Sequence, residues 1–464
     1  MFSTLFKGQS IPEIEKLWQS EPFIYDTAPK QNLTRWEVFQ TALLLSQFNF
    51  DTNETNPLSA IVLFQQRQHF LIACLAIALK KGQAILPPNL AENTLTNLQS
   101  EHANLWVFGD DPLPTLNNQQ SIQSTQIDEI INQVKATPQP FNATQLADAI
   151  LSCQDSEIWL YTSGSTGLPK KVVKTWFNMI QSANLAIERF DLMTPCFIVA
   201  TVPNQHMFGL ETTIFWPFFS KASLWHERPI FPEDVISALS ENTQSPALLV
   251  STPLHLNKLI AFDLDWPKHL SRLISATAPL PKALAVQIEQ QLDIQAFEVY
   301  GSTETASIAS KQTTASEMWQ TYKTTEFQKL ANGSYAVKTA GLTDFQPLND
   351  QIELTEKINN QHFKLGKRDS DLIKIAGKRA SLAELNLHLQ SIEGISEGVF
   401  MQPDHSQRLS AFVASTLSSP QILKALRKSI DPVFLPRPII FLSELPRNEV
   451  GKVLYNELQS QVTQ

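Results

Sequence analysis

A stretch rich in glycine, serine and threonine, YTSGSTGLPKKVV at 161–173, has the residue types that suit anion chemistry best. Backbone N–H groups and hydroxyls in such a turn can surround phosphate oxygens, and Lys170 can add positive charge. The nucleotide-loop pattern G-x-x-x-x-G-K-[ST] does not fit, because its second glycine would fall on Pro169 or Val172. The sequence therefore predicts an anion-binding loop of another kind.

Three later segments also end in small polar turns after an apolar run. They read ALLVSTP at 247–253, RLISATAPLP at 272–281 and AFEVYGSTE at 296–304. In an open α/β sheet, ligands bind in the crevice at the carboxyl ends of the strands. Together with 161–171, these turns predict one shared site.

The elements that must position these turns alternate between strand and helix signals. Apolar strand runs at 60–64, 105–109 and 157–163 are separated by helical segments, including an apolar helix at 68–81. Such alternation predicts an α/β fold, a large N-terminal α/β domain with mostly parallel sheets. The Asn/Gln-rich stretch at 112–126 is expected to be a surface connection.

The amino-acid composition changes near residue 365. A charged, turn-like segment is followed by short strands and helices, which predict a small α+β domain. The boundary is expected within 366–371, which divides the chain into 1–368 and 369–464.

Bulk properties exclude several classes of protein. The chain has 464 residues, 43% of them hydrophobic and 17% charged, and a net charge of −9, as expected of a folded globular protein. It has no long basic run, so no nucleic-acid partner is expected. The apolar run at 70–79 is too short for a transmembrane segment, and the first residues lack a signal-peptide pattern. Cys74, Cys153 and Cys196 fit no metal or redox spacing and are expected to be buried thiols of a cytoplasmic protein.

Four motifs occur in a characteristic order. They are YTSGSTGLPKKV, YGSTET at 300–305, GKRDSDLIKIAGKR at 366–379 and PRNEVGK at 446–452. In order and spacing the chain resembles the AMP-forming acyl/aryl-CoA synthetase, adenylation-domain and luciferase superfamily over nearly its whole length. The resemblance implies that the small C-terminal domain is mobile and rotates between two half-reactions.

The resemblance also implies a reaction. A carboxylate attacks the α-phosphate of ATP with Mg²⁺ to give an acyl-adenylate and pyrophosphate. The thiol of coenzyme A, or of a phosphopantetheinyl acyl carrier protein, then displaces AMP. Because the first step joins two anions, positive charge and orientation dominate the catalytic demand.

The glycine-rich stretch would hold the β- and γ-phosphates. The residues implied there are Thr162, Ser163, Gly164, Ser165, Thr166, Gly167 and Lys170. Where the family commonly has glycine this chain has Lys171, which either adds charge for pyrophosphate or faces solvent. Thr303 would contact the α-phosphate, and Glu304 would hold Mg²⁺, a cation that prefers carboxylate and phosphate oxygens.

Other motif positions would bind the nucleoside. Tyr300 resembles the aromatic residue that stacks on adenine, with Gly301 beside it. The adenine-side turn corresponds to Thr277, Ala278 and Pro279. Asp350 and Arg368 resemble the pair that binds the ribose hydroxyls, although this chain has LND where the family usually has Thr-Gly-Asp, so a surface turn stays an alternative for Asp350.

The C-terminal part would supply three further positions. Lys452 resembles the lysine that bridges the carboxylate and the α-phosphate during adenylation. Ser370 stands at the pivot position, and a hinge needs only a residue that tolerates a change of φ and ψ. Gly377 would line the thiol tunnel.

The acid pocket is expected near VPNQHMFGL at 202–210, where His206 is the pocket candidate and a buried core histidine is the alternative. Amino-acid-activating relatives place an aspartate shortly afterwards, whereas this chain has Phe208, and Glu211 is the nearest acid. FWPFF at 215–219 is expected to be core helix. An uncharged pocket favours an aromatic, fatty or hydroxy acid.

Two alternatives stay open. One is a stand-alone amino-acid adenylating enzyme, and the other is a catalytically inactive relative retained for binding. Intact Lys170, Glu304, Arg368 and Lys452 argue against the inactive relative, which has no chemical need for all four. Luciferase-like oxidation has no specific support in the sequence.

Overall fold

The computed structural model of the chain describes most residues, and all structural statements below concern these. They are 10–27, 31–52, 57–87, 92–102, 105–111, 120–163, 169–355, 361–368, 372–375, 378–403, 406, 408–448 and 451–462.

The chain forms two compact units. Unit 1 comprises 1–326 and 338–346, and unit 2 comprises 327–337 and 347–464. Unit 2 thus takes in residues on the N-terminal side of the boundary at 368/369. The division of the chain into 1–368 and 369–464 stays a prediction about which parts move.

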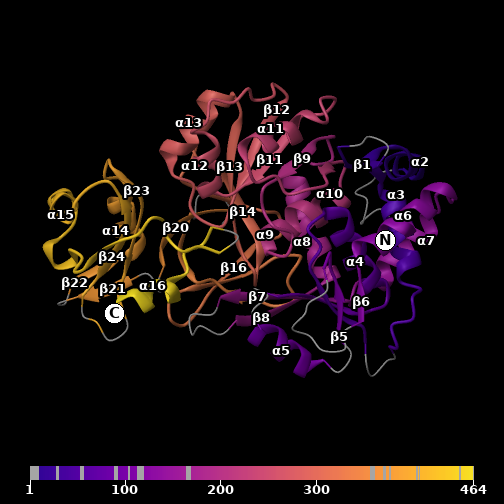
Figure 1. Cartoon of the computed structure of the whole chain (residues 1–464), viewed down its shortest axis with the longest axis horizontal. Coiled ribbons are helices and arrows are strands. Elements are labelled where there is room, and N and C mark those ends of the chain that lie inside the picture. Colours follow the sequence, from indigo (N-terminus) through magenta and orange to yellow (C-terminus); the bar gives the residue numbers. More distant parts are fainter. Residues whose placement is uncertain are drawn as a thin grey trace. The chain divides into compact units, whose positions relative to one another are not determined.

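The first sheet of unit 1 contains the glycine-rich stretch at one edge. Its strands, in spatial order, are β6 (Gln120–Ile122), β5 (Leu105–Phe108), β3 (Ser59–Val62), β4 (Gln83–Leu86), β7 (Glu157–Ser163) and β8 (Pro169–Thr175). All neighbours are parallel except β7 and β8, which form an antiparallel hairpin and lie side by side in Figure 1. The helices between them are α4 (Arg67–Leu79), α5 (Glu92–Glu101), α6 (Ser124–Ala136) and α7 (Ala143–Ser152).

The second sheet of unit 1 carries the other expected turns. Its strands, in spatial order, are β15 (Trp319–Thr321), β14 (Ala306–Gln312), β13 (Gln295–Ser302), β12 (Leu270–Ser275), β11 (Ala247–Ser251), β9 (Phe197–Ala200), β10 (Ser223–Trp225), β1 (Pro22–Tyr25) and β2 (Leu33–Thr34). The run from β13 to β1 is parallel, and the three remaining pairs are antiparallel. Parallel strands that are covered on both faces have largely apolar sequences without alternation. Residues 197–200 and 247–251 fit this rule, because both strands are entirely buried.

Helices accompany this second sheet and the N-terminal segment. They are α2 (Ile11–Glu15), the π-helix η1 (Lys16–Ser20), α3 (Arg35–Leu45), α8 (Trp176–Arg189), α9 (Met207–Gly209), the π-helix η3 (Leu210–Phe215), α10 (Trp216–Phe218), α11 (Pro232–Ser240), α12 (Pro253–Leu259) and α13 (Lys282–Leu292). The FWPFF segment at 215–219 is fully buried across η3 and α10, which confirms its assignment to the core. Helix α4 is buried along almost its whole length, as its apolar sequence predicts.

The expectation for 112–126 is wrong at its C-terminal end. Residues 120–122 form β6, which pairs with β5, and α6 begins at Ser124. The physical reason is Ile122, which is 2% exposed and anchors an otherwise polar edge strand to the core. Residues 112–119 lie outside the described part.

Unit 2 has its own strands and core. Its strands are β19 (Asp350–Leu354), β20 (His362–Arg368), β21 (Leu372–Ile375), β22 (Lys378–Ser381), β23 (Ile395–Met401), β24 (Ser410–Ser415) and β25 (Ile439–Phe441). Its helices are α14 (Leu382–Gln390), α15 (Ser419–Leu426), the 3₁₀-helix η6 (Pro432–Phe434) and α16 (Tyr455–Val462). The sheet β23–β24–β25 packs on α14 and α15 through Leu389, Val413 and Ile422, which agrees with the expected small α+β domain. Three further short strands, β16 (Glu326–Lys329), β17 (Tyr335–Lys338) and β18 (Gln346–Pro347), pair with one another.

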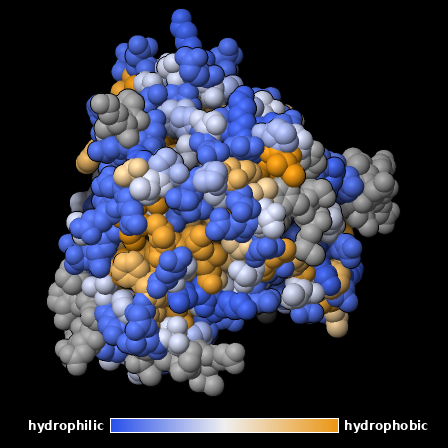
Figure 2. Space-filling view, turned by 90° about the vertical axis from the view of Figure 1, so that its right-hand side faces the viewer, coloured by the Kyte–Doolittle hydropathy of each residue, from blue (hydrophilic) through white to orange (hydrophobic). Residues whose placement is uncertain are grey.

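One face of the molecule combines hydrophilic side chains with a central apolar area (Figure 2). Among the described residues, the most exposed large apolar side chains are Phe231, Leu387, Ile11 and Ile230, at 67%, 62%, 59% and 56%. Scattered exposed apolar residues are ordinary on protein surfaces, so none of them is assigned a function.

Candidate active site

The β7–β8 hairpin displays the expected anion-binding stretch. Thr162 lies opposite Lys170, and Ser163 opposite Pro169, across the antiparallel ladder. The hairpin therefore fixes both ends of the stretch at one edge of the first sheet. The calls on Gly164, Ser165, Thr166 and Gly167, and the side chains of Thr162 and Ser163, lie outside the described residues.

The three lysines of β8 have different surroundings. Lys170 is exposed, and its Nζ lies 4.0 Å from Oε1 of Glu304, a residue of the YGSTET motif. Lys171 is also exposed and holds its Nζ 3.6 Å from the centroid of the Trp159 ring, a cation–π contact. Lys174, further along the strand, is only 4% exposed. The fold thus brings Lys170 and Glu304 together, although an exposed ion pair of this length adds little stability.

The turn between β13 and β14 presents Thr303 and Glu304. Ser302 and Thr305 bond each other reciprocally, since the Ser302 N–H donates to Oγ1 of Thr305 at 3.0 Å and the Thr305 N–H donates to Oγ of Ser302 at 3.2 Å. Ala306 has φ 56°, in the left-handed region that disfavours a residue with a Cβ. A Cβ on Gly301 would lie 2.2 Å from the Ala306 oxygen, so glycine is required there. The turn is a tight, specified structure in which the Glu304 side chain is 26% exposed.

Two buried ionisable residues, Lys174 and Glu211, contact the backbone of this turn. Nζ of Lys174 donates to the backbone oxygen of Glu304. Burial lowers the pKa of Lys174 to about 8, against the opposing effect of Glu211 and Glu304. Glu211 is 2% exposed and accepts from the N–H and Oγ of Ser307 and from Oγ of Ser182. Burial raises the pKa of Glu211, and these hydrogen bonds and Lys174 oppose the rise.

The adenine-side turn after β12 is attached to β13 by a carboxylate that sequence reasoning missed. Glu298 is 3% exposed, and its Oε1 accepts from the N–H of Leu280 at 2.8 Å. Its Oε2 accepts from Oγ1 of Thr313 at 2.6 Å and lies 3.2 Å from Nζ of Lys311. Thr277, at the start of the turn, has φ 77°. Ala278 and Pro279 are exposed at the turn itself.

Tyr300 lies at the end of β13, where it is half-buried. Its ring centroid is 5.5 Å from that of Trp319 on β15. Both aromatic rings belong to the same sheet as the Thr303–Glu304 turn. The residues expected on the adenine side therefore share one edge of this sheet.

The segment expected to close the acid pocket has a constrained backbone. His206 is half-buried and occupies the N-cap position of α9. A Cβ on Gly209 would lie 1.9 Å from the Pro203 oxygen, so only glycine fits there. Asn204 accepts from Oγ1 of Thr213 and donates to the Gln65 oxygen at 3.3 Å. The segment that contains His206 is thus linked through Asn204 to Gln65, just before α4.

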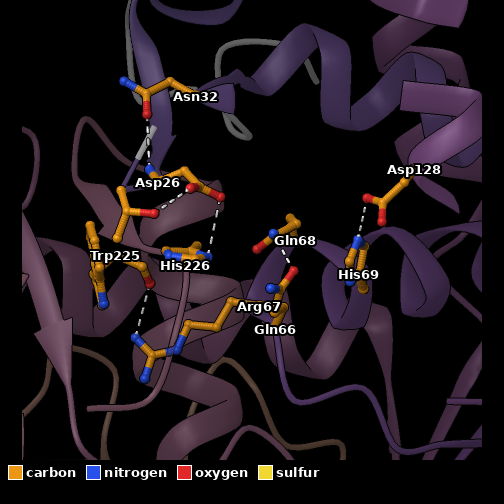
Figure 3. A network of polar contacts seen from close by, with 10 residues as sticks. Asp26, Asn32, Gln66, Arg67, Gln68, His69, Asp128, Trp225 and His226 are labelled. Atoms are coloured by element: carbon orange, nitrogen blue, oxygen red, sulfur yellow. Dashed lines mark hydrogen bonds and ion pairs between the residues drawn. The ribbon is translucent and has the colours of Figure 1, made fainter. Parts of the chain in front are cut away.

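A second polar network lies at the ends of β1 and β10 and at the start of α4 (Figure 3). Arg67 is fully buried and donates to the backbone oxygens of Trp225 and Ala200, the last residues of β10 and β9. Burial lowers its pKa to about 9, and Arg228 lowers it further, while Glu227 acts in the opposite direction. Beside it, Nδ1 of His226 lies 3.4 Å from Oδ2 of Asp26. Because Arg67 satisfies strand-end carbonyls of the core, this network is structural support for the neighbouring loops.

The expected ribose pair lies in unit 2. Asp350 and Arg368 face each other directly across the antiparallel ladder of β19 and β20. Two residues eighteen positions apart in the sequence are therefore neighbours, as a shared ligand requires. The side chain of Arg368, together with Ser370 and Gly377, lies outside the described residues.

Lys452 lies in a small hairpin of unit 2. Its N–H donates to Oδ1 of Asn448 at 2.9 Å, and Gly451 before it has φ 78°. Arg447 donates to the Gly451 oxygen at 2.8 Å and to Oε2 of Glu397 at 3.1 Å, which ties the hairpin to β23. These contacts anchor the described residues of the hairpin, and the Lys452 side chain is exposed.

Comparison with known proteins decides the family. The family model described as "AMP-binding enzyme" matches residues 61–333, more than half of the chain. The chain belongs to this family. The match begins at β3, includes the β7–β8 hairpin and extends past the Thr303–Glu304 turn. The resemblance inferred from the four motifs is confirmed, and so is the α/β fold class.

Relatives of this AMP-binding enzyme include ligases with different acceptors. The 2-succinylbenzoate–CoA ligase of Listeria monocytogenes is 23% identical over 65% of this chain and 69% of its own. The 3,4-dihydroxybenzoate–[aryl-carrier protein] ligase of Bacillus anthracis is 20% identical over 67% of this chain and 75% of its own. The solved O-succinylbenzoate coenzyme A synthetase of Bacillus subtilis, in complex with ATP and magnesium ion, has a TM-score of 0.75 at 18% identity, covering 96% of this chain and 98% of that one. At this identity the structural likeness shows the fold alone.

Within the described ranges of the AMP-binding enzyme, no helix has the length and apolar character needed to cross a membrane. In the same ranges, no group of three or more His, Cys, Asp or Glu side chains could hold a metal ion.

Proposed function

We propose that this AMP-binding enzyme is an acid–thiol ligase that works through an acyl-adenylate. A carboxylate oxygen attacks the α-phosphorus of ATP, a new O–P bond forms, and the bond to the β-phosphate breaks to release pyrophosphate. A thiol then attacks the acyl carbon, and AMP leaves. Family membership and the ligase names of the relatives support this reaction. The observation that carries it is the approach of Lys170 to Glu304, a cation and a carboxylate from two motifs at one site.

In the proposed nucleotide site, the stretch from Thr162 to Lys170 binds the β- and γ-phosphates and directs the pyrophosphate. Thr303 contacts the α-phosphate. Tyr300 stacks on adenine beside Gly301 and the turn of Thr277, Ala278 and Pro279. Neighbouring backbone and hydroxyl donors suit phosphate oxygens because they are oriented before the charge arrives.

Glu304 fits a magnesium site. Its carboxylate is partly exposed and offers hard oxygen ligands, and the described ranges hold no larger cluster of acidic or histidine ligands. Mg²⁺ commonly binds through one or two carboxylates plus substrate phosphates, so a single protein carboxylate is sufficient. The ion supplies charge neutralisation for the phosphates when it is bound.

Unit 2 provides the remaining groups in this proposal. Asp350 and Arg368, paired across β19 and β20, bind the ribose hydroxyls. Lys452 brings positive charge to the carboxylate and the α-phosphate during adenylation, and residues 369–464 move as a lid between the half-reactions, pivoting at Ser370. Gly377 lines the path of the thiol.

The proposed acid is aromatic, fatty or hydroxy-substituted and carries no ammonium group. An amino acid would need a carboxylate partner close to His206. Glu211, the nearest acid in the sequence, is buried and already accepts from Ser307 and Ser182. This observation disfavours an amino-acid adenylating enzyme.

The proposed acceptor is a phosphopantetheine thiol, either of coenzyme A or of a carrier protein. The names of the relatives cover both acceptors. The test is a pyrophosphate-release panel of benzoates, fatty acids, hydroxy acids and amino acids, each run with coenzyme A and with a phosphopantetheinylated carrier. Acid-dependent release for aromatic, fatty or hydroxy acids supports the proposal. Release with amino acids alone would overturn the acid class, and no release with any acid would favour an inactive relative.

A further inference from the structure

A buried lysine on β8 reaches the backbone of the Thr303–Glu304 turn. Lys174 is 4% exposed, and its Nζ donates to the Glu304 oxygen. A lysine is almost never buried without a partner, because removing an ammonium from water is costly. On the same strand, Lys170 and Lys171 are exposed, as lysines ordinarily are. The position of Lys174 therefore needs an explanation specific to this turn.

A buried carboxylate holds the other end of the same turn. Oε1 and Oε2 of Glu211 both lie 3.1 Å from the N–H of Ser307, and Oε1 also accepts from Oγ of Ser307 at 2.6 Å. Oγ of Ser182, on α8, donates to Oε1 at 3.1 Å. Glu211 thereby links η3, α8 and the first residues of β14.

The two charges hold the segment from Glu304 to Ser307 at both ends. Lys174 binds the carbonyl at its first residue, and Glu211 binds the N–H and hydroxyl at its last. Between them Ala306 has φ 56°, a conformation that an alanine avoids when nothing imposes it. The turn conformation is therefore imposed by contacts from β8 and η3 as well as by its own sequence.

We infer that Lys174 and Glu211 are positioning residues that hold the Glu304 carboxylate in the geometry needed for adenylation. This inference rests on the proposed function, because adenylation is the reaction that Glu304 serves. Neither residue touches substrate; each acts through the turn. Displacement of a reactive group by about 1 Å can cost about 100-fold in rate, so a buried support of this kind has a measurable effect.

The test compares four variants of the full chain. Lys174→Met removes the buried donor at similar length, Glu211→Gln removes the buried negative charge, and the double variant removes both charges. Lys171→Met is the matched control, because it deletes an exposed lysine of the same strand whose Nζ lies over Trp159. Each variant is measured for acid-dependent ATP–pyrophosphate exchange, for Mg²⁺-dependent ATP binding by calorimetry and for thermal stability.

Lys174→Met should lower kcat for exchange about 10- to 100-fold with little change in KM for the acid, because the lost support acts on the transition state. Lys171→Met should retain both parameters. The double variant separates the two roles, since Lys174 and Glu211 interact electrostatically and removal of both leaves neither charge buried without its counterpart, which can restore stability. If the pair positions Glu304, the double variant regains thermal stability but not kcat.

Two results would overturn the inference. One is wild-type kcat in a folded Lys174→Met variant, and the other is joint recovery of stability and kcat in the double variant. If none of the acids supports pyrophosphate exchange by the wild-type enzyme, the proposed function fails. Calorimetry of ATP binding then tests the positioning role alone. In that case Lys174→Met must lose the Mg²⁺-dependent part of ATP binding that a Glu304→Gln reference variant is expected to lose, or the positioning role fails as well.

Discussion

Replacing Glu298 by alanine should weaken both the fold and the binding of ATP. The buried carboxylate accepts from Leu280 and Thr313 and pairs with Lys311, so the substitution removes three partners at once. Removing one member of a buried charge pair typically costs about 3–5 kcal/mol. Lys311 is 18% exposed and its Nζ lies 4.7 Å from the Trp319 ring centroid, so it keeps some solvation and a cation–π partner. We therefore expect the lower end, about 3 kcal/mol, which corresponds to a decrease of roughly 4 °C in Tm if residues 1–326 and 338–346 unfold together.

The same substitution releases the adenine-side turn. The Leu280 N–H loses its acceptor, and Thr277–Pro279 precede it directly. A loss of about 1–2 kcal/mol in nucleotide binding would raise KM for ATP by about 5- to 30-fold. Glu298→Gln keeps an acceptor oxygen and should fall between the wild type and Glu298→Ala in both measurements.

Glu289 provides a matched control for this prediction. Its carboxylate also accepts three hydrogen bonds, from Ala296, Gln312 and Thr314, at 2.8, 3.0 and 2.6 Å, but it does not bind the adenine-side turn. Glu289→Ala should lower Tm and leave KM for ATP unchanged. Differential scanning fluorimetry and steady-state exchange kinetics measure the two effects. A Glu298→Ala protein with wild-type Tm and wild-type KM for ATP would refute the reasoning.

Three further predictions concern the lid, pH and the thiols. Lys452→Ala should lower ATP–pyrophosphate exchange by more than about 100-fold and spare thioester formation from preformed acyl-adenylate, because its charge is needed where two anions meet; full exchange in this variant would contradict the role. Burial lowers the pKa of His102, His226 and His255 in the folded chain. In the unfolded chain the histidine pKa is about 6.5, so below that pH the unfolded chain binds more protons than the folded chain. The free energy of unfolding should therefore be highest above that pH and fall as the pH drops through the lowered histidine pKa values. Tm should depend less on pH in His255→Gln than in the wild type, and an unchanged dependence would exclude a contribution from His255. Burial raises the pKa of Cys153 to about 12, that of Cys196 to about 11 and that of Cys74 further, so at pH 8 the native protein should resist iodoacetamide while the urea-unfolded chain reacts at all three thiols; rapid native alkylation, measured by mass spectrometry, would contradict this.

The sequence alone determined the fold class and the family of this protein. Alternating apolar runs predicted the parallel sheets because buried strands leave a local signature that needs no knowledge of their partners. The four motifs predicted the family because Gly, Ser, Thr and Lys in a fixed order are required by phosphate chemistry at particular turns. The strand β6 was missed because its single buried anchor, Ile122, gives no detectable periodicity within a polar stretch.

Only the tertiary structure decided which residues support the site. Lys174 and Glu304 are 130 positions apart, and Glu211 and Ser307 are 96 apart, so no local pattern relates them. The one signal available in the sequence was the alternation of strand side chains. Residues 171 and 173 lie on the exposed face of β8, so Lys174 falls on the opposite face, where it is buried. Glu211 shows the same limit, because the sequence offered it as the acid nearest the pocket and its four hydrogen bonds place it in the core. The anion-binding role of the stretch at 161–173 stays a prediction, whereas its hairpin register and the approach of Lys170 to Glu304 follow from how two sheets bring their strand ends together.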